Sequence, residues 1–161
     1  MGLNPEEASR AFRACLGQFA TGVTIVTCRG AEGHRCGITA NSFSSVSLDP
    51  PLILWNIARE SNSFSDFLAA KHFAVHILTD KQESLSVHFA RTDHTLFDSV
   101  EFADSEHGVP LLPNCLATFE CSTHQIHEAG DHYIIIGHVD SFTWDRADPL
   151  LFFSGNYRDL G

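Results

Sequence analysis

Hydrophobic and polar positions recur along this chain with two periods, which predict two or three short helices among a larger number of strands. Apolar residues between 8 and 19 recur at helical spacing behind Asn4 and Pro5, a cap and first-turn pair typical of a helix start. We expect this first helix to pack on a sheet. Shorter helical patterns cover 64–68 and 80–90, each opened by a pair that resembles a capping box.

Alternating or β-branched runs predict about six or seven strands, without the regular strand and helix alternation that builds parallel sheets. The two longest runs, 114–127 and 133–144, are joined by a loop whose Gly130-Asp131 suits a hairpin. Residues 94–113 lack periodicity, so we expect a long surface loop that acts as a lid or an interface. The whole pattern favours a closed antiparallel β-barrel with helical decoration. The other predicted strands are 21–28, 38–47, 52–55, 73–78 and 150–154.

The length and the charge of the chain indicate a single domain that does not bind nucleic acids or anionic membranes. With 161 residues, 43% of them apolar, residues 1–161 are expected to form a single domain with its own core. The formal net charge is -10, and the ten Lys and Arg residues are scattered, which argues against nucleic-acid or anionic-membrane binding.

The cysteines and the N-terminus bear on the compartment. Five cysteines without a CxxC pair fit a reducing compartment better than a disulfide framework. The N-terminus lacks the basic and apolar pattern of a secretory signal, and no apolar run approaches the length of a membrane span. We therefore expect a cytoplasmic protein. The cysteines are Cys15, Cys28, Cys36, Cys115 and Cys121.

The stretch 37–57 contains the most distinctive chemistry. Residues 38–47 combine strand-forming residues with hydroxyl and amide side chains, but they include no acid, base or thiol. Such a run can present backbone and short side-chain hydrogen-bonding groups to a flat, uncharged heterocycle, and we interpret it as a cofactor cradle. The alternative is an ordinary hydroxyl-rich strand and turn. Neither interpretation provides a titrating catalyst.

Further along the chain, Ser61, Asn62 and Ser63 precede a predicted helix, with Arg59 nearby, and are candidates for binding a phosphate. The alternative is that they only cap the helix. His132 follows a Gly-Asp turn, and the pair Tyr157-Arg158 offers an aromatic plate and a cation to a planar or phosphorylated ligand. The alternatives are a solvated surface histidine and a tail pinned by one aromatic residue.

Other chemistries find little support in the sequence. There is no GxGxxG, GxSxG or HExxH motif, and a P-loop-like spacing at 17–22 is followed by Val23 where lysine is required. Cys121, His124 and His127 form the best metal-like group. On a strand Cys121 and His127 would lie about 20 Å apart, so we predict no metal site there, unless this segment is helical and holds a structural zinc.

These segments together resemble a known family. Residues 20–24, 39–43, 45–52, 130–132 with Gly137, and 157–158 resemble the short-chain flavin reductases, the reductase components of two-component flavin-dependent monooxygenases. The likeness runs from about Phe12 to Leu160, with the motifs in the family's order and spacing. A departure is His76, where relatives often have Asn.

The resemblance implies a homodimeric FMN-binding split β-barrel, antiparallel and Greek-key-like, with a few short flanking helices. It implies hydride transfer from NADH or NADPH to FMN or FAD, and delivery of the reduced flavin to a separate monooxygenase. The implied flavin-binding residues are Thr39, Ala40, Asn41, Ser42, Ser45, Val46, Asn56, Ser61, Asn62, Ser63, Phe89 and Ala90. The implied nicotinamide-binding residues are His132, Tyr157 and Arg158.

Because hydride transfer is carried by the two cofactors, the missing acid and base are consistent with such a reductase. We hypothesise that His132 is the catalytic-site residue that orients the nicotinamide and that it transfers no proton. Two alternative functions remain open. The same barrel could hold FMN as a carrier or sensor, or its flavin could reduce another acceptor such as a corrinoid or a ferric chelate.

Overall fold

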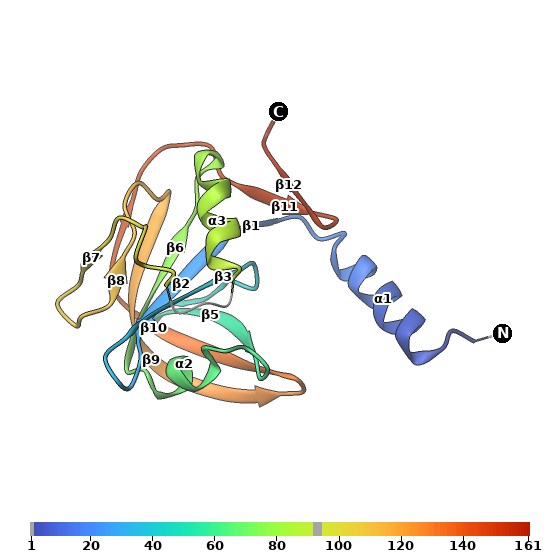
Figure 1. The fold of residues 1–161 in the computed structure, drawn as a ribbon, viewed down its shortest axis with the longest axis horizontal. Coiled ribbons are helices and arrows are strands. Elements are labelled where there is room, and N and C mark those ends of the chain that lie inside the picture. The colour runs from blue at the N-terminus through green and yellow to red at the C-terminus, as the bar shows by residue number, and fades with distance from the viewer. Residues whose placement is uncertain (1, 92–94) are drawn as a thin grey trace.

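Seven antiparallel strands form the main sheet of the computed structural model, which describes residues 2–91 and 95–161 (Figure 1). This confirms the expected mainly β, antiparallel class. Strands β3 and β4 are the two edges, and no pairing joins them among the described residues, so the barrel is split and not closed. In sheet order the strands are β3 (Arg35–Ala40), β2 (Thr24–Arg29), β6 (His72–Ile77), β9 (Ala117–Ala129), β10 (His132–Trp144), β5 (Pro51–Ala58) and β4 (Ser44–Leu48).

The two longest strands form the predicted hairpin at the centre of this sheet. β10 pairs with β9 on one side and with β5 on the other, and Gly130 adopts a φ of 67° in the connecting turn. Gly137 lies at an irregularity of the ladder, where an added Cβ would come within 2.5 Å of the Phe73 ring. The glycine therefore lets a large aromatic side chain pack directly against the backbone of β10.

Short helices pack on the sheet and contribute to two apolar clusters. Phe67, on α2 (Phe64–Ala69), belongs to the larger cluster. Its ring packs edge-on against Trp55, with the ring centroids 4.9 Å apart. Phe89, on α3 (Glu83–Phe89), is buried in the smaller one, and a 3₁₀ turn, η1 (Asp80–Gln82), leads into that helix. Both helices lie where the helical periodicity predicted them.

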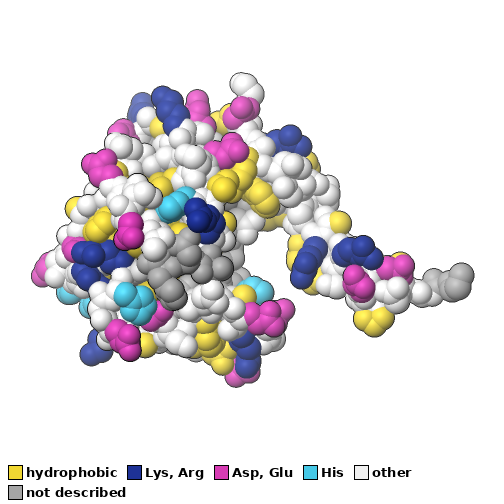
Figure 2. Space-filling view, viewed as in Figure 1, with side chains coloured by type: hydrophobic (Ala, Val, Ile, Leu, Met, Phe, Trp, Pro, Cys, Tyr) yellow, Lys and Arg dark blue, Asp and Glu magenta, His cyan; other side chains and the backbone are white. Residues whose placement is uncertain are grey.

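Helix α1 (Pro5–Leu16) begins as predicted, with an Asn4 capping box, but it does not pack on the sheet. None of its residues is buried, and the helix stands away from the barrel (Figure 1, Figure 2). The expectation that it packs on the sheet was therefore wrong. An amphipathic pattern predicts that one face of the helix is apolar and becomes buried, but it does not identify the surface on which that face packs.

The segment predicted as a surface loop also differs. Leu96, Val109 and Leu112 are buried, and this segment contributes the small hairpin of β7 (Ala103–Asp104) and β8 (Pro110–Leu111); His94 lies outside the described residues. A three-stranded sheet of β1 (Thr21–Gly22), β11 (Leu151–Phe153) and β12 (Asn156–Arg158) joins the start of the barrel to the C-terminal segment. Within the described ranges, no helix has the length and hydropathy needed to cross a membrane.

Candidate functional site

A cavity of about 610 Å³ opens beside the edge strand β3. Its volume lies in the range of roughly 300 to 1,000 Å³ that is usual for cofactor sites. Strand β3 contributes Gly37 and Ile38 to the wall, the segment before α2 contributes Ser61 to Ser63, and the end of α3 contributes Phe89 and Ala90. The structure therefore brings five of the predicted flavin-binding residues to one cavity: Ser61, Asn62, Ser63, Phe89 and Ala90.

Gly37 permits the close packing of the wall on the α3 side. A Cβ at this position would lie 2.5 Å from a ring carbon of Phe89, so any larger residue would push the ring away from the strand. Phe89 in turn packs edge-on against Phe97, with the ring centroids 5.1 Å apart. The result is an aromatic wall held directly against the backbone of β3.

The hydroxyl groups of the serines before α2 contact each other, and Ser61 Oγ also accepts the Ser63 backbone N–H at 3.4 Å. Ser63 is the N-cap residue of α2, yet its side chain makes no capping hydrogen bond. The Ser61 and Ser63 hydroxyl oxygens lie 3.3 Å apart, and both residues line the cavity. The alternative that these serines only cap the helix therefore finds no support in the side-chain geometry of Ser63.

Residues 39–42 follow the lining residues Gly37 and Ile38 in the chain, and two of them are held by hydrogen bonds within the fold. The Thr39 hydroxyl donates to the Ser86 carbonyl oxygen at 2.6 Å, and Thr24 Oγ1 donates to the Ala40 carbonyl oxygen at 2.6 Å. Asn41 is exposed. These contacts fix the backbone of β3 between β2 and α3, which leaves its free edge as the part available to a ligand.

Ser42, the last residue of this segment, is hydrogen-bonded to Asn56 on β5. The Asn56 backbone N–H donates to Ser42 Oγ at 2.9 Å. The Asn56 side-chain oxygen is buried and lacks a hydrogen-bond partner among the described residues. A buried acceptor without a partner is costly, so this oxygen is suited to receive a hydrogen bond from a bound hydroxyl group.

Like residues 39–42 and Asn56, the remaining predicted residues lie outside the cavity lining. Ser45 and Val46 are exposed on β4, at the opposite edge of the sheet, where the ladder with β5 is irregular. His132 is exposed at the start of β10, with its Nδ1 2.7 Å from an Asp131 carboxylate oxygen. Arg158, on β12, is also exposed.

Tyr157 has a defined contact. Its hydroxyl oxygen lies 2.7 Å from that of Ser86, a buried residue of α3, and its ring packs edge-on against Phe152. Ser86 thereby links Tyr157 to Thr39, which contacts the Ser86 carbonyl oxygen. Ser86 shows no sign of this role in the sequence, because a serine inside a short helix carries no local signal of it.

The family follows from comparison with known sequences. The sequence model of the flavin reductase like domain matches residues 16–161. The chain belongs to the flavin reductase family. This confirms the resemblance that the motifs had indicated.

Individual flavin reductases are similar over most of this chain. An NADH-dependent FMN reductase of Agrobacterium fabrum is 46% identical, over 94% of this chain and 86% of that protein. The reductase component of a flavin-dependent trigonelline monooxygenase of Acinetobacter baylyi is 43% identical over 92% of this chain. The chain spans only 48% of the length of that protein.

Solved structures of flavin reductases share the fold. An NADH:FAD oxidoreductase of Streptomyces globisporus, in complex with NAD and FAD fragments, superimposes with a TM-score of 0.90 at 36% identity. That comparison covers 100% of this chain and 97% of the other. A homologue of nitrilotriacetate monooxygenase component B from Mycobacterium thermoresistibile gives a TM-score of 0.92 at 35% identity, covering 98% and 89% of the two chains.

The flavin reductase cavity also has lining residues that the sequence analysis missed. His34, Cys36 and Asp66 lie on its wall, with His34 Nε2 3.1 Å from an Asp66 carboxylate oxygen. This contact raises the pKa of His34. Residues 34 and 66 are far apart in sequence, and neither belongs to a motif, so only the fold reveals the contact.

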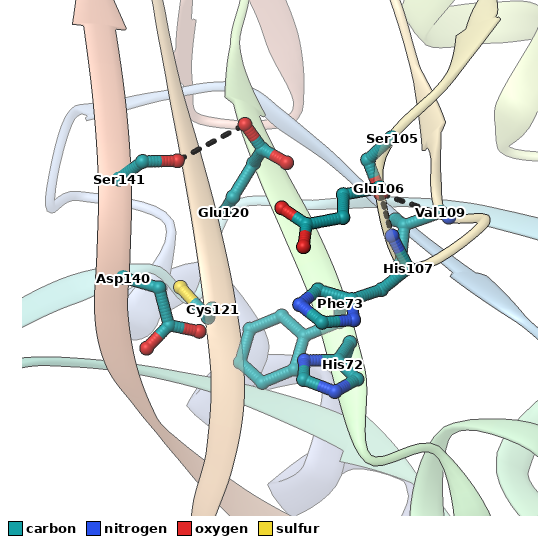
Figure 3. Close-up of a pocket in the computed structure, with 10 residues that line it drawn as sticks. All are labelled: His72, Phe73, Ser105, Glu106, His107, Val109, Glu120, Cys121, Asp140 and Ser141. Atoms are coloured by element: carbon teal, nitrogen blue, oxygen red, sulfur yellow. Dashed lines mark hydrogen bonds between the residues drawn. The ribbon is translucent and has the colours of Figure 1, made fainter.

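A second, smaller cavity of about 180 Å³ lies under the β7–β8 hairpin (Figure 3). The rings of His72 and His107 stack there with centroids 3.7 Å apart, and burial followed by the charge of His107 lowers the pKa of His72. Burial alone would raise the pKa of Asp140, but hydrogen bonds with Ser122 and His138 outweigh burial and hold it below its usual value. The volume is below the usual range for a cofactor, so the larger cavity is the better candidate for flavin.

Proposed function

We propose that this flavin reductase transfers hydride from NADH or NADPH to FMN or FAD, and that the flavin binds in the cavity beside β3. The observation that carries the proposal is the free edge of β3 along that cavity. β3 pairs with β2 alone among the described strands, so its outward backbone groups remain available to a flat heterocycle. Bound flavin and nicotinamide supply the redox chemistry when they meet, and the protein needs no catalytic acid or base of its own.

The residues around the cavity suit the separate parts of a flavin. The hydrogen bonds of Thr39 and Ala40 hold β3 in place for the ring, while Phe89 and Ala90 line the cavity beside it. Asn56, with its unpaired buried oxygen, suits the hydroxyl groups of the ribityl chain. Ser61, Asn62 and Ser63 suit the phosphate, because hydroxyl and amide groups donate well to anionic oxygens. The inclusion of Ser45 and Val46 rests on the family resemblance.

His132, Tyr157 and Arg158 are proposed to bind the nicotinamide cofactor. Tyr157 contacts Ser86, and Ser86 contacts Thr39, so the C-terminal hairpin is tied to the strand proposed to hold the flavin. His132 is exposed and paired with Asp131, which fits an orienting role for its imidazole. We propose that its role is to position the nicotinamide.

We also propose that the protein is a homodimer, in which α1 packs on a second copy. Phe12, Leu16 and Phe19 are 65%, 58% and 80% exposed on or just after this helix. An isolated helix of about twelve residues is marginally stable in water, so α1 requires a surface to cover its apolar face. A second copy of the chain is the occupant that we propose.

The reduced flavin is proposed to pass to a separate flavin-dependent monooxygenase. Relatives are named as reductase components of such systems, among them the trigonelline enzyme of Acinetobacter baylyi. The five cysteines are free thiols, which supports a reducing, cytoplasmic location for the protein.

Steady-state oxidation of NADH and NADPH with added FMN or FAD tests the proposed activity, together with calorimetric titration of each flavin. We expect saturable turnover above the protein-free rate and binding of at least one flavin. Flavin binding without turnover would instead indicate a carrier or sensor. Turnover that requires a corrinoid or ferric chelate and no added flavin would indicate another acceptor.

A further inference from the structure

Three side chains with metal-binding atoms meet on the wall of the larger cavity. The ligand atoms of His34, Cys36 and Asp66 all lie within 4.8 Å of one another. His34 Nε2 and an Asp66 carboxylate oxygen are already 3.1 Å apart. Among the described residues, this is the single group of three or more His, Cys, Asp or Glu side chains gathered so closely.

The fold brings these residues together from two elements. His34 directly precedes β3, Cys36 is the second residue of that strand, and Asp66 lies in the first turn of α2. Gly30 gives them room. A Cβ at Gly30 would lie 2.4 Å from His34 Cε1 and 2.6 Å from an Asp66 carboxylate oxygen.

Cys28 supports the cluster from behind. It lies directly opposite Cys36 on the neighbouring strand and is fully buried, and its interaction with Cys36, followed by burial, raises the pKa of its thiol. Cys36 is 6% exposed and lines the cavity, so its sulfur can be reached from that side alone. A buried residue packed directly behind a ligating sulfur is the kind of supporting contact that orients metal ligands.

We propose that His34, Cys36 and Asp66 bind a divalent transition-metal ion of the Zn²⁺ type, with the fourth coordination position open to the cavity. Imidazole nitrogen, thiolate and carboxylate are the ligands that Zn²⁺ takes in proteins. Mg²⁺ and Ca²⁺ prefer sets made of oxygen atoms, so they do not fit this group.

The present spacing requires only a small adjustment. Around a tetrahedral Zn²⁺, neighbouring ligand atoms lie roughly 3.5 Å apart, as bond lengths of about 2.0 to 2.3 Å dictate. The nitrogen and oxygen atoms already meet this separation. The His34 side chain is 46% exposed and is free to rotate toward the sulfur. None of the three residues is assigned a role in the proposed hydride transfer, and the metal site lies on the wall of the same cavity.

Anaerobic titration of the full-length, chelator-treated protein with Co²⁺ tests the site through absorbance, without any assay of activity. The titration is carried out in a Cys15→Ser background, because Cys15 is an exposed thiol. We expect a thiolate-to-cobalt charge-transfer band with the weak visible bands of four-coordinate Co²⁺, and we expect Zn²⁺ to displace both. Absence of the charge-transfer band would overturn the proposal.

Variants assign the band to this cluster. Cys36→Ser should abolish it, whereas Cys115→Ser should leave it unchanged, since Cys115 is a half-buried thiol outside the cluster. Asp66→Asn and His34→Gln retain the thiol and should weaken Co²⁺ binding roughly tenfold or more. Circular dichroism checks the fold of each variant. If folded Asp66→Asn and His34→Gln proteins bind Co²⁺ as the parent does, the proposed ligand set is wrong.

Discussion

The hydroxyl oxygens of Tyr157 and Ser86 lie 2.7 Å apart and join β12 to α3. On the other side of this contact, the Ser86 carbonyl oxygen accepts a hydrogen bond from Thr39 at 2.6 Å. Ser86 is fully buried and Thr39 and Tyr157 are half-buried, so both contacts are partly shielded from water. A residue proposed to bind flavin and a residue proposed to bind nicotinamide therefore share one support on α3.

Removing the Tyr157 hydroxyl should destabilise this junction. We expect Tyr157→Phe to lower the free energy of unfolding by about 1 kcal/mol, because the buried Ser86 hydroxyl loses its side-chain partner. Urea denaturation measures the change. Tyr133→Phe is the matched control, since the Tyr133 ring packs on Phe64 and the substitution retains the ring. Equal stability losses in the two variants would contradict the assignment.

The serines before α2 should act on the phosphate of the flavin. We expect the double variant Ser61→Ala/Ser63→Ala to weaken FMN binding about tenfold or more, because hydrogen bonds to a charged group contribute roughly 1.5 to 3 kcal/mol each. Riboflavin, which lacks the phosphate, should bind both proteins equally. Calorimetry with the two ligands makes the comparison.

The control for this pair is Ser44→Ala, which removes an exposed hydroxyl group on β4. It should leave FMN binding unchanged. If the double variant lost FMN and riboflavin affinity to the same extent, the serines would support another part of the flavin or the fold.

The parts of the fold that sequence predicts are those with a regular local pattern. The hairpin of β9 and β10 and the helices α2 and α3 lie where periodicity and turn residues place them. The buried residues Leu96, Val109 and Leu112 escaped prediction because they are irregularly spaced and β7 and β8 have two residues each. Elements this short show no period.

In the candidate site, too, the residues in local patterns could be predicted from the sequence, and the long-range contacts could not. The serines before α2 and the end of α3 were chosen from local sequence and from the resemblance, and the structure places them on one cavity. The contact of His34 with Asp66 joins residues that lie far apart in the chain, and it depends on the absence of a side chain at Gly30. No local sequence pattern encodes such a contact, because it forms only when the chain folds.

His132 should affect nicotinamide binding more than flavin binding. We expect His132→Ala to raise the KM for NADH about tenfold at saturating flavin, which corresponds to about 1.4 kcal/mol of lost binding. The KM for flavin should change little. Steady-state kinetics with each substrate varied in turn gives both values.

His124→Ala is the matched control, because His124 is an exposed histidine in the middle of β9. Unchanged NADH kinetics in the His132 variant would remove this residue from the proposed site. A fall in kcat that increases at low pH would instead indicate that His132 transfers a proton.

The apolar face of α1 should hold two copies of the chain together. We expect Phe12→Glu/Leu16→Glu to convert a dimer to a monomer, because both side chains are more than half exposed in the single chain and would place charges in the interface. Sedimentation velocity over a range of concentrations measures this. Arg10→Glu changes the charge of an exposed helix position and should leave the dimer intact. A wild-type protein that sediments as a monomer would exclude the dimer.

Finally, His76 should make the protein sensitive to acid. This residue of β6 is fully buried, its Nδ1 lies 3.0 Å from the Ile25 carbonyl oxygen, and its Nε2 accepts the Leu112 backbone N–H at 3.1 Å. Burial lowers the pKa of His76 to about 4, although the hydrogen bond with the Ile25 carbonyl oxygen acts to raise it. The folded protein therefore keeps this imidazole neutral at pH values where the unfolded chain binds a proton.

The sign of the effect follows from that difference. Between about pH 6.5 and pH 4 the unfolded state holds more protons, so the free energy of unfolding falls as the pH falls, by about 2 kcal/mol at pH 5 from this group. His76→Asn should remove this part of the pH dependence, and His124→Asn, an exposed control, should retain it. Urea denaturation at about pH 7.5 and pH 5 compares the three proteins. The His76→Asn variant lacks the buried neutral imidazole, whereas the His124→Asn variant keeps it. If the wild type and both variants lost the same stability between about pH 7.5 and pH 5, His76 would not be the cause of that loss.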